Sequence, residues 1–288
     1  MSPSARDRLL SAWLRTCGAV SAAVVALIAV FLITESWPAL HRVGWARFFT
    51  DPSWHPAADA AAGTFNLAPM LAGTLLASAG AVLVATPLGV LSAAFCQFFA
   101  PPRLAGPYRR LIQLLAGIPS VVYGFWGLVV LVPLIRRLEP PGPSLLAGVA
   151  ILAVMILPTV ALQADAALAA VSRDVLRAAA AAGLSRTALI TGVALPAARA
   201  GILTGILLAT GRALGETMAI LMVCGNIVQV PASLFDPIRT LTANIALEMA
   251  YALDDHRSAL FVSGLILLLL VVVLVALVEL LHPRRAHA

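Results

Sequence analysis

The sequence predicts an all-α integral membrane protein with about six transmembrane helices. Of the 288 residues, 61% are hydrophobic and 11% are charged, whereas soluble domains have roughly 45–50% apolar and about 25% charged residues. The mean hydropathy is +0.98, and apolar runs extend over the whole chain. A soluble fold cannot bury so much apolar surface, so we expect one membrane domain.

The transmembrane helices follow from the lengths of the apolar runs. A bilayer core about 30 Å thick requires roughly 20 apolar residues in a helix. Runs of that size lie at residues 12–35, 67–99, 111–135, 144–168, 197–224 and 258–281. Gly and Pro lie inside several of these runs, as at residues 85–89, 117–120 and 157–159. We expect them to kink helices that otherwise continue.

The chain also divides after its first loop. Arg6 and Arg8 precede the first span and Arg15 lies near its start, and the apolar stretch is too long for a signal-peptide core, so we expect an uncleaved anchor. We therefore assign residues 1–66 to an N-terminal anchor helix and a first external loop. Residues 67–288 then form a core of five transmembrane helices.

The orientation follows from the arginines in the connecting segments, because positively charged loops remain in the cytoplasm. We place both termini inside, which leaves twelve arginines inside, six outside and Arg212 within a span. The inside set is Arg6, Arg8, Arg15, Arg103, Arg109, Arg110, Arg173, Arg177, Arg186, Arg199, Arg284 and Arg285. The outside set is Arg42, Arg47, Arg136, Arg137, Arg239 and Arg257. Topology and contact with membrane lipid thus explain most of the net charge of +6, and we expect no nucleic-acid partner.

Several classes of chemistry are excluded by residue type. All 19 basic side chains are Arg, and a phosphate-binding loop needs a Lys on the nucleotide phosphates, so this chain does not hydrolyse ATP through such a loop. Cys17, Cys96 and Cys224 are too scattered for a zinc site or a disulfide framework. We expect no catalytic residue, no metal and no cofactor.

The longest cytoplasmic connection, residues 169–196, differs in composition from the rest of the chain. Residues 178–182 are all Ala, a strong helix former, and Gly183 supplies a helix stop. The segment is either a surface linker helix or a knob whose small side chains let another protein approach closely. We expect Asp165, at the end of the preceding span, to bind backbone or an arginine of this connection.

This connection resembles the signature of ABC-importer permeases, in which Glu-Ala-Ala, three residues, Gly, nine residues, an aliphatic residue and Leu-Pro form the coupling helix. The matching positions are Ala178, Ala179, Gly183, Val193, Leu195 and Pro196. Arg177 stands where the signature has Glu. The difference bears on the charge contact to the ATPase and leaves the helix unaffected.

The fifth span carries a longer motif. Residues 211–219 read Gly-Arg-Ala-Leu-Gly-Glu-Thr-Met-Ala and closely resemble the phosphate ABC permeases of the PstC type. Residues 117–124, 225–226, 231–240 and 243–246 are similar to the same family. The sister permease of that transporter would read Gly-Glu-Thr-Ala-Pro, so Met218 and Ala219 favour the PstC type.

The resemblance implies a type I ABC importer fold in the bacterial inner membrane. It implies a subunit that forms half of a transmembrane pathway for phosphate. The implied partners are a PstA-like sister permease, a PstB-like ATPase dimer and a PstS-like periplasmic phosphate-binding protein. ATP hydrolysis is then expected in a partner chain, and the first external loop is periplasmic.

Arg212 and Glu216 are ionisable groups at membrane depth, where a charge costs about 2.5–3.5 kcal/mol on insertion scales. The planar guanidinium of Arg212 suits tetrahedral oxyanions. Glu216 lies four residues later, on the same face of a continuous helix, where the two side chains can meet. Glu216 either neutralises Arg212 or opens toward substrate and accepts a hydrogen bond from a protonated phosphate oxygen.

Three hydroxyl groups lie near this pair in the expected pathway. Thr217, Ser120 and Tyr123 either donate to a passing ion or pack and bond between helices. Of these, Thr217 is expected in the substrate pathway with Arg212 and Glu216.

Three alternatives remain open at the level of the sequence. The coupling signature is shared among importers, so the cargo is phosphate or another oxyanion such as sulfate, molybdate or phosphonate. A proton-driven secondary transporter would use Glu216 as a relay, but the chain lacks a clear pair of repeated hydropathy halves. A membrane-embedded enzyme would need a paired nucleophile and base, and the sequence offers none.

Overall fold

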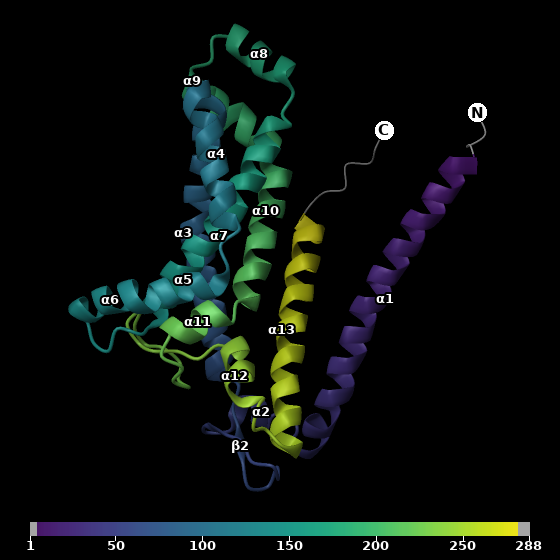
Figure 1. Cartoon of the computed structure of the whole chain (residues 1–288), viewed down its shortest axis with the longest axis vertical. Coiled ribbons are helices and arrows are strands. Elements are labelled where there is room, and N and C mark those ends of the chain that lie inside the picture. Colours follow the sequence, from purple (N-terminus) through teal and green to yellow (C-terminus); the bar gives the residue numbers. More distant parts are fainter. Residues whose placement is uncertain (1–4, 282–288) are drawn as a thin grey trace. The chain divides into compact units, whose positions relative to one another are not determined.

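The computed structural model describes residues 5–281, whose regular elements are helices apart from one short pair of strands (Figure 1). Arg284 and Arg285 lie outside the described residues. Six helical segments of the described chain are long and apolar enough to cross a bilayer. They are Leu9–Arg42, Ala68–Phe99, Ser120–Leu138, Leu145–Ala169, Arg186–Gly215 and Asp254–Leu277. The prediction of an all-α protein with six spans is confirmed.

The described chain forms two compact units. One contains residues 5–66 with Glu248–Leu268, and the other contains Leu67–Leu247 with the chain from Leu269. The elements of the first are α1 (Ala5–Arg42), α2 (Arg47–Thr50), β1 (Trp54–His55), β2 (Thr64–Phe65) and the first part of α13 (Asp254–Leu281). Strands β1 and β2 are antiparallel, with Trp54 opposite Phe65.

Buried polar contacts hold the first unit together. Glu248 Oε2 accepts a hydrogen bond from Trp54 Nε1 at 2.9 Å and lies 2.9 Å from His256 Nε2. Asp255 pairs with Arg42 at 3.1 Å. These contacts tie the first external loop to the segment that begins the last span.

The second unit contains the remaining elements. They are α3 (Ala68–Ala94), η1 (Phe95–Phe99), α4 (Pro102–Ala116), α5 (Ser120–Trp126), η2 (Gly127–Leu131), α6 (Val132–Leu138), α7 (Leu145–Ala169), α8 (Arg173–Ala181), α9 (Arg186–Leu189), η3 (Ile190–Ala194), α10 (Leu195–Gly215), α11 (Met218–Val223) and α12 (Leu241–Glu248). Helix α7 is the most buried span and packs against α3, α4 and α10 (Figure 1).

Small residues let these helices approach closely, as is common where apolar helices pack in lipid. A Cβ atom added to Gly89 of α3 would lie 2.8 Å from Val160 Cγ1 on α7. A Cβ atom added to Gly205 of α10 would lie 2.6 Å from Gln163 Cβ. The core of the second unit is therefore centred on α7.

Two of the predicted spans are wrong in their bounds, because both helices are broken. The run at residues 111–135 divides after Ala116, and the spanning segment begins only at Ser120. The run at residues 197–224 divides at Glu216, and its spanning segment begins earlier, at Arg186. Hydropathy did not reveal either break, since the sequence is apolar on both sides of each.

Candidate functional site

The two broken spans meet in the second unit. Helices α5 and α11 each follow a break and pack against one another (Figure 1). A Cβ atom at Gly124 of α5 would lie 2.8 Å from Ala219 Cα on α11, so the contact requires glycine. Broken helices at membrane depth are tolerated where protein or a polar cavity satisfies the backbone, and they mark binding sites in many transporters. We therefore take this double break as the candidate site.

Arg212 lies in the last turn of α10, immediately before one break. Its side chain is exposed, and the guanidinium interacts electrostatically with the Tyr123 hydroxyl of α5. No carboxylate whose side chain the structure describes forms an ion pair with it. The C-terminal end of a helix favours a cation. Arg212 is thus held near the break with its donors available to an anion.

Glu216 is not on the helix face that carries Arg212. Helix α10 ends at Gly215, and Glu216 has extended backbone angles, φ −68° and ψ 128°. Its Oε1 accepts a hydrogen bond from the Ala219 backbone nitrogen at 3.1 Å, at the start of α11. Of the two alternatives for Glu216, the pairing with Arg212 is absent from the described ion pairs, because that pairing needs a continuous helix.

The three hydroxyl groups have different surroundings. Tyr123 is buried, and its hydroxyl donates to the Leu115 carbonyl at 2.8 Å, which satisfies a group freed by the break after Ala116. Thr217 donates to the Gly215 carbonyl at 3.3 Å and is half-buried. Ser120 begins α5 and is also half-buried. In this conformation the Tyr123 hydroxyl donates to the backbone beside the break, so its proton is not available to a substrate.

A second charged group lies at the cytoplasmic end of α7. Asp165 accepts two hydrogen bonds from Arg109 of α4, at 2.8 and 3.0 Å, and one from Gln97 of η1 at 2.8 Å. The expectation that Asp165 binds an arginine of the coupling connection is wrong. The hydrogen bonds that Arg109 donates to Asp165 raise the pKa of Arg109 above its ordinary value, so this guanidinium stays charged. The group clamps three elements together.

The coupling connection contains the helix that the Ala run predicts. Helix α8 begins after Ser172, whose Oγ accepts from the Asp174 nitrogen at 3.3 Å, and the chain turns at Gly183 with φ +81°. Every residue of α8 is at least partly exposed. Leu195 and Pro196 begin α10. The distal end of the signature thus begins the helix that carries Arg212, and α9 and η3 connect this helix to α8.

Arg177 projects from α8 with 75% of its side chain exposed. Its partner is Asp174, at 3.4 Å and 89% exposed. An exposed pair of this kind contributes little to stability. Arg177 is therefore free to meet a partner protein.

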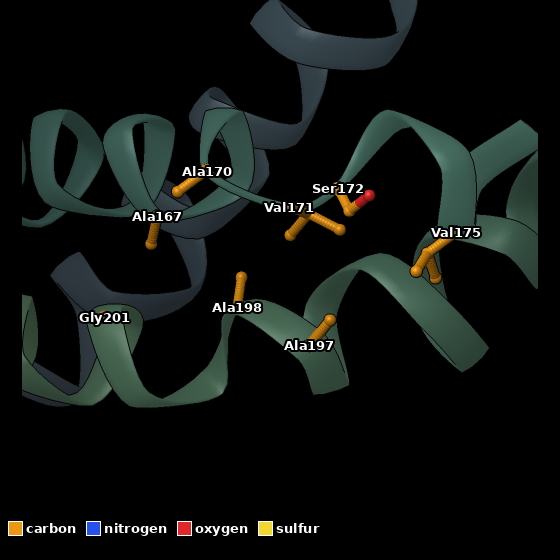
Figure 2. A pocket seen from close by; sticks show the side chains of 8 residues that line it. All are labelled: Ala167, Ala170, Val171, Ser172, Val175, Ala197, Ala198 and Gly201. Carbon is orange, nitrogen blue, oxygen red and sulfur yellow. The ribbon is translucent and has the colours of Figure 1, made fainter. Parts of the chain in front are cut away.

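A hollow of about 360 Å³ lies at the base of α8 (Figure 2). Small and apolar side chains from the end of α7, from α8 and from the start of α10 surround it. They are Ala167, Ala170, Val171, Ser172, Val175, Ala197, Ala198 and Gly201. A hollow thus lies beside the start of α8, while Leu176 of α8 packs against the buried cluster formed by α3, α7 and η3.

Residues 85–287 match the family described as binding-protein-dependent transport system inner membrane component. The chain belongs to this family. As an inner membrane transport component, it is a multi-pass subunit without a catalytic site of its own. The matched range contains both the coupling connection and the double break.

Full-length relatives within this family include named phosphate permeases. The phosphate transport system permease protein PstC of Mesorhizobium japonicum is 34% identical, over 94% of this chain and 88% of the relative. That of Haemophilus influenzae is 32% identical, over 91% and 88%. The probable ABC transporter permease protein YqgH of Bacillus subtilis is 34% identical, over 93% and 88%.

Solved ABC transporters share the fold. A chain of the bacterial alginate ABC transporter aligns with a TM-score of 0.64 at 14% identity, covering 94% of each chain. A chain of the inward-facing MetNI methionine transporter aligns with a TM-score of 0.56 at 18% identity, covering 75% of this chain and 94% of that one. These structures establish the ABC importer permease fold that the coupling signature implies.

Proposed function

We propose that this chain is the PstC-type permease subunit of a phosphate ABC importer. The observation that carries the proposal is the 34% identity, over 94% of this chain, with a phosphate transport system permease protein PstC. The geometry is consistent with this assignment, because Arg212 has donors but no anionic partner within the described chain.

Arg212 would contact the phosphate ion as it passes the double break. A guanidinium offers two parallel donors to an oxyanion and remains charged when desolvated. Glu216 holds the start of α11 through the Ala219 nitrogen, so it would accept a phosphate proton only after releasing that bond. Thr217 would line the path beside it.

The energy would come from partner chains. A PstB-like ATPase dimer would dock on the exposed face of α8, through Arg177, Ala178, Ala179 and Gly183. Movement of α8 would be transmitted to α10 through Leu195 and Pro196. Helix α10 would then transmit it to the break at Glu216. A PstA-like permease would form the other half of the pathway, and a PstS-like protein would deliver phosphate from the periplasm.

Uptake of labelled phosphate at low concentration tests this function. The host cells lack their own high-affinity system and express this chain alone or with its ATPase, sister permease and binding protein. We expect uptake only with the full set, insensitive to a protonophore and not competed by sulfate. Competition by sulfate would indicate that the transported ion is another oxyanion and not phosphate specifically. Uptake by the chain alone, abolished by the protonophore, would make it a secondary transporter.

A further inference from the structure

A partly buried polar cluster lies in the connection between α11 and α12 and in the first turn of α12, outside the pathway residues described above. Arg239 Nε donates to the Asn226 backbone oxygen at 3.0 Å, and Arg239 Nη1 donates to Asn244 Oδ1 at 3.1 Å. The guanidinium thus bridges two asparagines that are far apart in sequence. By the arginine count, this connection lies on the external side.

The partners fix the orientation of both side-chain amides. Arginine only donates, so the Asn244 atom that faces Arg239 is the oxygen. Asn226 Nδ2 donates to the Leu221 carbonyl at 2.7 Å, so the oxygen of Asn226 is its other end. Asn244 Nδ2 and Asn226 Oδ1 remain, and both are buried without a hydrogen-bond partner. The side chain of Asn244 is wholly buried, at 0% exposure.

Buried polar groups without partners are rare in native proteins, because each loses its hydrogen bonds to water and gains none. Here one unused donor and one unused acceptor accompany the same guanidinium. A protonated oxyanion matches this set, since an unprotonated oxygen accepts from Asn244 Nδ2 beside the positive charge of Arg239. Its hydroxyl donates to Asn226 Oδ1. Hydrogen phosphate carries such a proton at neutral pH, and sulfate does not.

Hydrogen bonds connect the start of α12, which carries Asn244, to the double break. Thr242 Oγ1 donates to the Glu216 backbone oxygen at 2.8 Å, and the Leu241 nitrogen donates to Thr74 Oγ1 of α3 at 3.0 Å. The first turn of α12 therefore touches both the break and α3. A rearrangement at Glu216 would reach Asn244 through one turn of helix.

We propose that Asn244, Asn226 and Arg239 form an outer phosphate-binding site, which the ion occupies before it reaches Arg212. This inference rests on the proposed function. The unused atoms are buried in the present conformation, so phosphate gains access when the connection opens during the transport cycle. The site would discriminate by the phosphate proton, independently of Glu216.

The variant Asn244→Asp tests the donor role. Asp keeps the oxygen that accepts from Arg239, so a purely structural role is preserved or strengthened. It replaces the unused donor with a second anionic oxygen, which repels phosphate. In the complete complex we expect the KM for phosphate uptake to rise about tenfold or more, as for loss of a hydrogen bond to a charged group. The control Ser233→Asp adds the same charge at an exposed position of the connection and should leave the KM unchanged.

The variant Asn226→Gly removes the acceptor Asn226 Oδ1, together with the hydrogen bond from Asn226 Nδ2 to the Leu221 carbonyl. Asn226 has φ +56°, a conformation that glycine adopts readily, and the backbone oxygen that accepts from Arg239 is retained. We expect sulfate to become a competitor of phosphate uptake. If the wild-type complex takes up phosphate and neither variant changes KM or selectivity, the inference is wrong, and ordered water alone fills the cluster. Absence of phosphate uptake by the wild-type complex would instead contradict the proposed function.

Discussion

Two arginines of the second unit, Arg109 near the end of α7 and Arg212 at the double break, differ in the partners of their guanidinium groups. At the cytoplasmic end, Arg109 is bound twice by Asp165, which Gln97 also binds. At the double break, Arg212 has no ion pair in the described chain, and Glu216 caps α11 instead. A paired charge near the membrane stabilises a fold, whereas an unpaired one is available to a substrate. We therefore assign structure to the first site and transport to the second.

Loss of the glycine contact at the double break should have the largest effect. Gly124→Ala places a Cβ atom 2.8 Å from Ala219 Cα, which is backbone and cannot yield easily. Overpacking of this kind costs about 1–3 kcal/mol, so we expect a lower unfolding temperature of the purified complex and little phosphate uptake. Gly192→Ala, where no atom lies within 4 Å of the added Cβ, is the matched control. Equal behaviour of the two variants would contradict the close packing of α5 and α11.

Removal of the ion pair between Asp165 and Arg109 should lower the stability of the protein more than it changes phosphate transport. Asp165→Ala leaves Arg109 without its partner, and Arg109 is one-third exposed, at 33%. After allowance for that exposure we expect a loss of about 1–2 kcal/mol in the free energy of unfolding.

A double-mutant cycle with Arg109→Ala separates the pair from its surroundings. The double variant should recover part of the lost stability, and its phosphate KM should match wild type. A changed KM with normal stability would place the clamp in the substrate pathway.

Glu216→Gln separates the two roles of that residue. Gln keeps an oxygen that accepts from the Ala219 nitrogen, so α11 should remain capped and the complex should assemble. We expect discrimination between phosphate and sulfate to weaken, because an amide also donates to an oxyanion. Uptake competed by sulfate is the measurement. A variant that still distinguishes the two ions would remove Glu216 from selectivity.

Arg177→Glu should have the smallest effect. The side chain is 75% exposed, and its pair with Asp174 is weak, so the fold should not change. A surface charge contact is worth about 0.2–1 kcal/mol, and we expect ATP-driven uptake to change by at most about fivefold. ATP hydrolysis measured with and without the binding protein reports this coupling. An unchanged ratio would show that Arg177 does not contact the ATPase.

Much of the fold follows from hydropathy and composition, because lipid imposes a span length and the Ala run imposes a helix. The ends of α8 follow from Ser172 and Gly183, which are local signals. At residues 117–119 the sequence predicts a kink where the structure has a break, since Gly and Pro do not distinguish a bend from an interruption. The break at Glu216 has no proline at all.

The partners of the polar side chains could not be predicted, because they lie far away in sequence. Asp165 binds Arg109, 56 residues earlier in the chain. The cluster of Asn226, Arg239 and Asn244 forms only when the connection folds back on itself. Its sequence signal is two asparagines at the two ends of a connection that holds several other polar residues, which by itself does not indicate an unsatisfied pair.

The central claim is that Arg212 remains unpaired in order to contact the transported ion. Its direct test is phosphate accumulation and ATP hydrolysis, measured together in vesicles that contain the purified complex with either Arg212 or Arg212→Ala. We predict that the variant complex assembles and hydrolyses ATP but accumulates no phosphate. Normal phosphate accumulation by the variant would contradict the account, and failure of the variant to insert or assemble would assign Arg212 a structural role.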